Sequence, residues 1–173
     1  MLTRAPITSE LADQLVTALI GEPVRHRFGQ ITSAPDRFGR RTLYAPPDVA
    51  TGWIDRVNAA DAMGTDPFIL ACHAYAEVAL SHPYADGNGR LARALYQRAF
   101  ARAGLLDAPL IPLGPLIYLN HKVVIAALVH LGTTGDWPPF MNVMARLTLK
   151  ALAFTEHYMK SYAPPPPRDT SVP

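Results

Sequence analysis

Apolar residues recur at three- and four-residue spacing along most of the chain, and this period predicts a mainly α-helical protein. Over residues 8–21 the leucines share one face, Thr8 or Ser9 can cap the start, and Gly21 ends the helix. The same criteria predict further helices at residues 46–63, 67–82, 89–103, 116–131 with a break near Asn120, and 140–162.

Local polar and turn residues sharpen some of these boundaries. Asp66 is a typical N-cap, and Pro67 fits a first helical position, where its missing N–H has no helical partner. Residues 132–136 predict a turn before the last helix. We expect Arg98 and Arg102, further along the 89–103 helix, to face solvent.

Residues 24–45 differ from the rest because they are strongly basic and interrupted by turn residues. Two short extended runs, residues 28–32 and 41–45, flank a turn and predict a β-hairpin. Charge alone leaves two interpretations of this segment open. It is either a solvated basic surface loop or a loop that serves a phosphate site or a substrate.

Composition limits the class of protein. The 173 residues suit one domain, and 49% hydrophobic residues suffice for a core. The net charge of +2 argues against a broad nucleic-acid or membrane surface. The longest aliphatic run, residues 123–129, is too short to span a bilayer, and the N-terminus lacks a signal-peptide core. With Cys72 as the single cysteine, we expect a cytoplasmic protein, or one exported by a non-classical route.

The candidate chemistry lies in His82–Arg93, which reads His-Pro-Tyr-Ala-Asp-Gly-Asn-Gly-Arg-Leu-Ala-Arg. Glycines before a helix permit close ligand approach, and the free N–H groups of the helix start bind anions. Arg90 and Arg93 are three apart, so both lie on one face of that helix start. Two guanidinium groups at one place favour a di- or triphosphate ligand.

Two further side chains complete this candidate site. Asp86 is a carboxylate beside the proposed phosphate site, an arrangement that Mg²⁺ stabilises by bridging carboxylate and phosphate oxygens. His82 precedes it by one loop and can accept a proton from an attacking hydroxyl near neutral pH. The residues thus indicate a site for transfer from a nucleotide to a hydroxyl.

His82–Arg93 resembles the signature of the Fic domain family, His-Pro-Phe-x-(Asp/Glu)-Gly-Asn-Gly-Arg-x-x-Arg. Tyr84 replaces the usual Phe, and its additional hydroxyl needs a partner or a path to solvent. Residues 41–47 resemble the family's flap running into a helix, and residues 134–140 resemble its downstream Gly-Asp turn. The resemblance covers roughly residues 22–150.

The resemblance implies an all-α core of about six to eight helices with a β-hairpin flap. It implies transfer of AMP from ATP, with Mg²⁺, onto a Ser, Thr or Tyr hydroxyl of a target protein. The residue roles that it implies are as follows: His82 is the base, Asp86 holds the Mg²⁺, Gly87, Asn88 and Gly89 form the anion pocket, Arg90 and Arg93 bind the phosphate chain, and Leu43 and Tyr44 dock the target on the flap.

Two comparisons with the family pattern bear on regulation and nucleotide choice. The family's inhibitory pattern, (Ser/Thr)-x-x-x-Glu-(Gly/Asn), is not found around Glu10, Glu22, Glu77 or Glu156. The domain is therefore unregulated, or inhibited by a small antitoxin, or inhibited by a segment outside this chain. In the family's base pocket, the usual tyrosine pair and asparagine correspond here to Ile125, Ala126 and Thr133, so the choice of base is open.

These observations predict a Fic domain over residues 1–162 and a flexible proline-rich tail over residues 163–173. The predicted function is protein adenylyltransferase of a bacterial toxin–antitoxin or effector type, acting on a target protein. The alternatives are transfer of UMP or another phosphate-linked group, and a catalytically silent nucleotide-binding module. We expect no nucleic-acid or membrane partner.

Overall fold

The computed structural model describes residues 5–33, 39, 41, 43–105 and 111–161, and only the backbone of residues 158–161. The predicted tail, residues 163–173, lies outside this part. The described chain is a helical bundle, as the sequence predicts, without extended strands. Its elements, in order, are α1 (Ser9–Ile20), α2 (Pro47–Thr51), α3 (Trp53–Ala62), α4 (Pro67–Ser81), α5 (Asn88–Arg102), α6 (Leu113–Leu119), α7 (His121–Thr134) and α8 (Pro138–Ser161).

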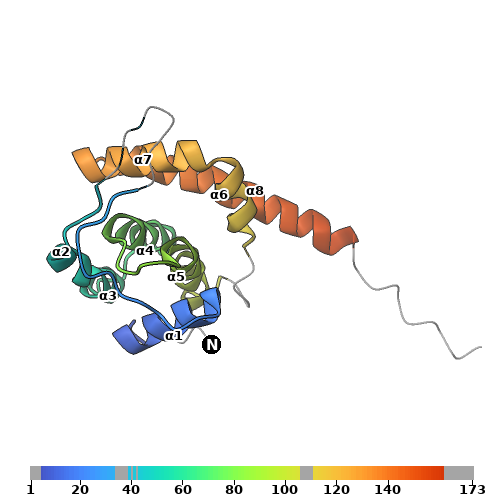
Figure 1. Ribbon diagram of the computed structural model, residues 1–173. Helices are drawn as coiled ribbons and strands as arrows, with labels where there is room; N and C mark the ends of the chain where they lie inside the picture. Colours follow the sequence, from blue (N-terminus) through green and yellow to red (C-terminus); the bar gives the residue numbers. More distant parts are fainter. Residues whose placement is uncertain (1–4, 34–38, 40, 42, 106–110, 162–173) are drawn as a thin grey trace, which may run out of the picture.

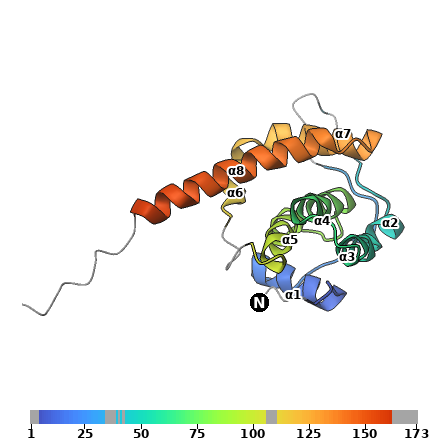
Figure 2. The same ribbon diagram turned by 180° about the vertical axis from the view of Figure 1, so that it is seen from behind.

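Helix α4 lies at the centre of the bundle, packed along α5 and surrounded by α2, α3, α7 and α8 (Figure 1). Eight of its residues are buried, so it is apolar nearly all round. Helix α1 covers the other side of α5, as the view from behind also shows (Figure 2). The loop between α4 and α5, which carries His82–Arg93, is therefore held by the two best-packed helices.

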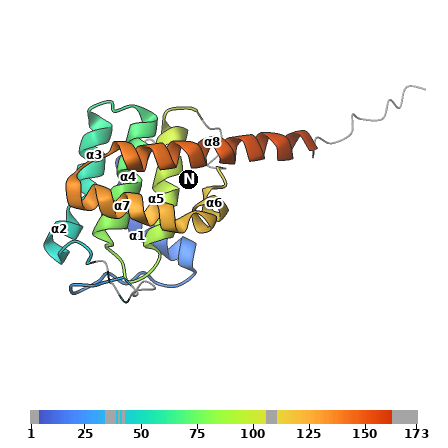
Figure 3. The same ribbon diagram turned by 90° about the horizontal axis from the view of Figure 1, so that it is seen from above.

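Helix α8 is longer than the bundle that it covers, and its C-terminal part projects beyond the other helices (Figure 3). The first half of α8 contributes four buried residues to the core: Phe140, Met144, Leu147 and Ala151. No single helix in the described ranges is long and apolar enough to cross a membrane. Helices α6 and α7 reach the required length and apolarity only as a pair, and they meet at 87°.

Several predicted boundaries are confirmed. Asp66 caps α4 by accepting hydrogen bonds from the N–H groups of Phe68 and Ile69, and Thr8 caps α1. The predicted break at Asn120 separates α6 from α7. Three boundaries were wrong: the predicted 46–63 helix is broken at Gly52, α6 begins at Leu113 instead of residue 116, and α7 continues through Thr134 into the predicted turn.

The expectation that Arg98 and Arg102 face solvent was also wrong. Arg98 is 4% exposed and donates a hydrogen bond to the carbonyl of Ala5. Arg102 forms an ion pair with Asp61 of α3 at 2.8 Å. The N-terminal segment and α3 pack over this face of α5, which helical spacing cannot indicate, because the partners are distant in sequence.

Candidate active site

His82 ends α4 in a left-handed backbone conformation, with φ 50° and ψ 57°. It is the only described residue other than glycine with positive φ. This conformation costs an L-residue about 1–2 kcal/mol. Its N–H still donates to the carbonyl of Val78 at 2.9 Å, so His82 turns the chain sharply out of the helix and into the loop.

The loop is closed by the amide side chain of Asn88, the first residue of α5. Its Oδ1 accepts from the N–H of Tyr84 at 3.0 Å, and its Nδ2 donates to the carbonyl of Tyr84 at 2.7 Å. Asn88 is 2% exposed. This side chain therefore braces the loop, and only the backbone N–H of Asn88 is left for the predicted anion pocket.

Gly87 is the N-cap of α5, with φ 86°. A Cβ atom there would lie 2.9 Å from side-chain carbons of Val16 and Ile20, so α1 packs directly against the glycine. The next N–H groups, of Asn88 and Gly89, are at the first positions of the helix and have no helical partner. The N–H groups of Asn88 and Gly89 are thus available as backbone donors for an anion, whereas that of Gly87 is bonded to Asp86.

Asp86 is exposed beside this helix start. Its Oδ1 accepts from the N–H of Gly87 at 2.6 Å, while its other oxygen has no hydrogen bond or ion pair among the described residues. A carboxylate fixed by one oxygen and open at the other fits Mg²⁺, which commonly takes one or two protein carboxylates and completes its shell with phosphate oxygens and water.

The two motif arginines start from the same end of α5 and reach different neighbours. Arg90 is exposed and donates to the carbonyl of Leu19, at the end of α1, at 3.3 Å. Arg93 is half-buried, with its guanidinium near Gly89 and Gly114, and it has no hydrogen bond or ion pair in the described part of the chain. Arg90 and Asp86 also line a cavity of about 340 Å³ with Glu22 and Arg25.

The imidazole of His82 is half-buried, and Tyr44 of the flap stacks on it with the ring centroids 4.0 Å apart. Its Nδ1 is buried, so Nε2 is the nitrogen available to a substrate. Burial lowers the pKa of His82, and the positive charge of Arg27 lowers it further, whereas the Ala79 carbonyl and Asp86 oppose the shift. Burial also raises the pKa of Tyr44.

The predicted hairpin is present as a single antiparallel bridge between Thr32 and Leu43, and its turn lies outside the described residues. The N–H of Tyr44 donates to the carbonyl of Ile31 at 3.2 Å, and that of Ala45 donates to Leu80 of α4 at 3.3 Å. Leu43 is 66% exposed, as a docking residue must be. The flap thus runs from solvent at Leu43 to the end of α4.

The hydroxyl of Tyr84 has the partner that the sequence required. It donates to Oδ1 of Asp13 in α1 at 2.8 Å, while Oδ2 of Asp13 contacts Nε2 of His26 at 3.2 Å. Tyr84 is 2% exposed, and both its burial and Asp13 raise the pKa of its hydroxyl. Sequence reasoning indicated that a partner was needed but did not identify Asp13 or His26.

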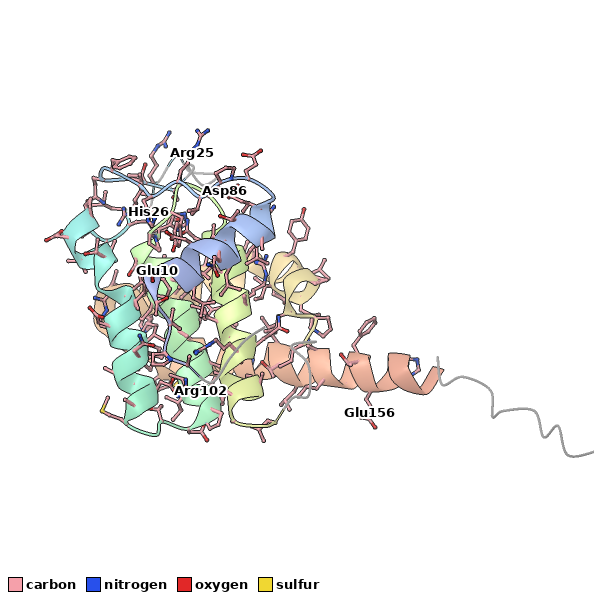
Figure 4. All side chains as sticks on the ribbon, turned by 90° about the horizontal axis from the view of Figure 1, so that it is seen from below. Glu10, Arg25, His26, Asp86, Arg102 and Glu156 are labelled. Atoms are coloured by element: carbon pink, nitrogen blue, oxygen red, sulfur yellow. The ribbon has the colours of Figure 1, made fainter. Side chains whose placement is uncertain are left out.

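Figure 4 shows Arg25, His26 and Asp86 gathered at one end of the bundle, with Arg102 at the opposite end. The predicted base-pocket residues lie elsewhere, on α7: Ile125 is 53% exposed, and the hydroxyl of Thr133 donates to the carbonyls of Val129 and His130. Neither lines the cavity beside Asp86 and Arg90. Their role stays a prediction.

The fold and the motif loop define the class of protein. Residues 7–99, more than half of the chain, match the Fic/DOC family, and the chain belongs to this family. The matched range contains the whole of His82–Arg93.

Two curated relatives indicate what related proteins do. The protein adenylyltransferase fic-1 of Caenorhabditis briggsae is 30% identical over 121 residues, which cover 68% of this chain and 22% of that protein. A uridine 5'-monophosphate transferase of Xanthomonas campestris pv. campestris is 30% identical over 128 residues, covering 65% of this chain and 23% of that protein. This chain therefore spans less than a quarter of either relative.

Solved structures show the same fold. A Fic domain containing signaling protein from Bacteroides thetaiotaomicron superposes with a TM-score of 0.72 at 21% identity, covering 91% of this chain and 65% of that one. Fic-1 from Caenorhabditis elegans superposes with a TM-score of 0.66 at 22% identity, covering 91% and 45% of the two chains. At these identities the likeness concerns the fold.

Proposed function

We propose that this chain transfers a nucleoside monophosphate, AMP from ATP, onto a Ser, Thr or Tyr hydroxyl of a target protein. The observation that carries the proposal is the position of His82. Its ring stacks on the flap residue Tyr44, and its backbone begins the loop that leads into the N-terminus of α5. A proton acceptor, a docking strand and an anion site therefore meet at one loop, as attack of a hydroxyl on a phosphate requires.

In the proposed reaction the target hydroxyl oxygen attacks the α-phosphorus of ATP and forms a new P–O bond. The bond between that phosphorus and the oxygen bridging to the β-phosphate breaks, and pyrophosphate leaves. His82 takes the hydroxyl proton on Nε2, since its Nδ1 is buried. The lowered pKa of His82 keeps the ring neutral and able to accept this proton at pH 7.

The nucleotide phosphates would be held by groups at the start of α5. The N–H groups of Asn88 and Gly89 would donate to phosphate oxygens, and Arg90 and Arg93 would bind along the chain of phosphates. Mg²⁺ on the open oxygen of Asp86 would neutralise phosphate charge. The exposed Leu43 would let the target lie along the flap as an added strand.

A second candidate reaction is transfer of UMP. The relative from Xanthomonas campestris pv. campestris bears this name and has the same 30% identity to the chain as the C. briggsae adenylyltransferase. A binding module without turnover is the third reading, and an intact His82 argues against it.

We also propose that a small partner protein can supply an inhibitory glutamate to Arg93, which has no ion-pair partner among the described residues.

The test incubates the protein with labelled ATP, UTP, GTP or CTP, Mg²⁺ and a cell lysate. The matched control is His82→Asn, because asparagine tolerates the left-handed backbone of this position but is not a base. Label that arrives from ATP, and only with the wild-type protein, supports the proposal. Label from UTP alone would favour the second reaction, and nucleotide binding without any label would favour a binding module.

A further inference from the structure

Arg27 lies on the extended segment that precedes the flap, and this segment pairs with the motif loop. His26 and Tyr84 form an antiparallel bridge. The N–H of Arg27 donates to the carbonyl of Pro83 at 3.2 Å, and the N–H of Ala85 donates to the carbonyl of Arg25 at 2.8 Å. No local pattern indicates this pairing, because the two segments are far apart in the chain.

The side chain of Arg27 contacts the residue that precedes His82 in the chain, whereas its backbone contacts the residue that follows. Its Nη2 donates to the carbonyl of Ser81 at 2.8 Å and also to the carbonyl of Ala45 on the flap. Arg27 therefore bonds the carbonyls of both residues that flank His82, one through its backbone and one through its guanidinium. With the same nitrogen it ties down the residue that follows Tyr44.

These hydrogen bonds of Arg27 matter because the backbone of His82 is strained. A non-glycine residue persists in the left-handed region only when its surroundings hold it there. Two of the groups that hold it, the carbonyls of Ser81 and Pro83, are fixed by Arg27. The third bond of Arg27, to Ala45, holds the flap where the Tyr44 ring stacks on the imidazole.

We propose that Arg27 is a positioning residue, which holds His82 and the flap in register for transfer to a hydroxyl. The proposal of a role in the reaction rests on the proposed function, whereas the holding role concerns the protein alone. In this role Arg27 contacts neither the target hydroxyl nor the α-phosphate, and it acts through His82 and Tyr44.

The chemistry of the guanidinium suits this role better than that of an ammonium. Arginine is always charged and presents donors in a planar fork, so one nitrogen can serve two carbonyls in a fixed geometry. The Nε and Nη1 atoms of Arg27 are buried and have no hydrogen-bond partner among the described residues. The positive charge of Arg27 also lowers the pKa of His82 and so favours the neutral imidazole.

The experiment compares Arg27→Met, which keeps the length but loses donors and charge, with Arg27→Lys, which keeps the charge and a single-atom donor. Arg146→Met, at an exposed position of α8, controls for the loss of one positive charge. Two measurements need no nucleotide: hydrogen exchange of the Tyr44 and Ala45 amides, and NMR titration of the His82 ring. A third measures kcat and KM of transfer.

For Arg27→Met we expect flap amides to exchange at least about tenfold faster and the pKa of His82 to rise. We expect kcat to fall by about 100-fold, as for a displaced reacting group, with KM for the nucleotide nearly unchanged. Arg27→Lys should keep the lowered pKa of His82 and recover part of kcat, and Arg146→Met should match the wild type.

If Arg27→Met kept the hydrogen-exchange rates of the flap amides and the kcat of the wild-type protein, the proposal would be overturned. So would a loss of kcat that only follows the fraction of folded protein, with no change in the titration of His82. If the wild-type protein transfers no nucleotide, the exchange and titration results still decide whether Arg27 holds His82 and the flap. Failure of the proposed function and failure of this inference therefore give different results.

Discussion

The ring of Tyr44 lies 4.0 Å from the imidazole of His82, centroid to centroid, and the two planes are inclined by 25°. One residue belongs to the flap and the other to the end of α4. The stacked ring packs against one face of the imidazole and restricts its rotation. The lone pair of a neutral Nε2 lies in the ring plane, so a hydroxyl that gives up its proton must approach in that plane. The flap, which we propose docks the target, thus also packs against the ring of the proposed base.

Replacement of Tyr44 by alanine should free the His82 ring. An aromatic pair is worth about 0.5–1.5 kcal/mol beyond its buried area, so transfer should fall by about 2- to 10-fold. The pKa of His82 should rise, because burial is the main cause of its lowering. NMR titration and kcat measure the two effects. Tyr44→Phe keeps the stack and should behave as the wild type; an equal loss in both variants would contradict the stacking role.

The pH dependence of transfer should report the His82 base. Its pKa is lowered, mainly by burial and then by Arg27, so the ring stays neutral to a pH below the ordinary value of 6.5. The acidic limb of kcat/KM should therefore have its midpoint below 6.5, and activity should be lost as the pH falls through it. A midpoint at or above 6.5 would show that another group or a solvated imidazole is titrating.

Tyr84→Phe restores the residue usual in the motif and removes the hydroxyl that donates to Asp13 at 2.8 Å. A hydrogen bond to a charged group is worth about 1.5–3 kcal/mol, and partial exposure of Asp13 reduces this. We expect a loss of about 1 kcal/mol, or a Tm lower by about 2–4 °C.

Tyr118→Phe is the control for this variant, since Tyr118 is 77% exposed and should tolerate the loss of its hydroxyl. Thermal unfolding of Tyr84→Phe, Asp13→Asn and the double variant completes a double-mutant cycle. Additive losses would mean that the hydroxyl and the carboxylate do not interact in solution.

Gly87→Ala should damage the site more than the fold. Its positive φ costs alanine about 1–2 kcal/mol, and the new Cβ would lie 2.9 Å from Val16 and Ile20. The start of α5 must then move away from α1, and transfer should fall by at least about tenfold. Gly135→Ala shares the positive φ but meets nothing within 4 Å, so it should lose stability without a comparable loss of kcat. Equal kcat in both variants would refute the role of the close packing.

The helices and the motif loop were predictable because their signals are local. Asp66 and Pro67 start α4, and Gly87 marks the start of α5. The break at Gly52 was missed, since a glycine inside an apolar pattern does not say whether the helix continues.

What could not be predicted depends on partners far apart in sequence. Arginine is usually a surface residue, and Arg98 is buried where the N-terminal segment crosses α5. Arg27 was one of many basic residues in residues 24–45, and its place beside His82 follows from the pairing of two distant segments. Nothing in the spacing of those arginines distinguishes it from Arg25.

The bond between Tyr84 and Asp13 has an evolutionary consequence. A buried tyrosine hydroxyl at this position of the motif needs an acceptor, and Asp13 of α1 supplies it. The two positions should therefore covary among homologues. An acidic residue should accompany tyrosine at position 84, and where phenylalanine occupies the motif, position 13 should be constrained only by its contact with His26.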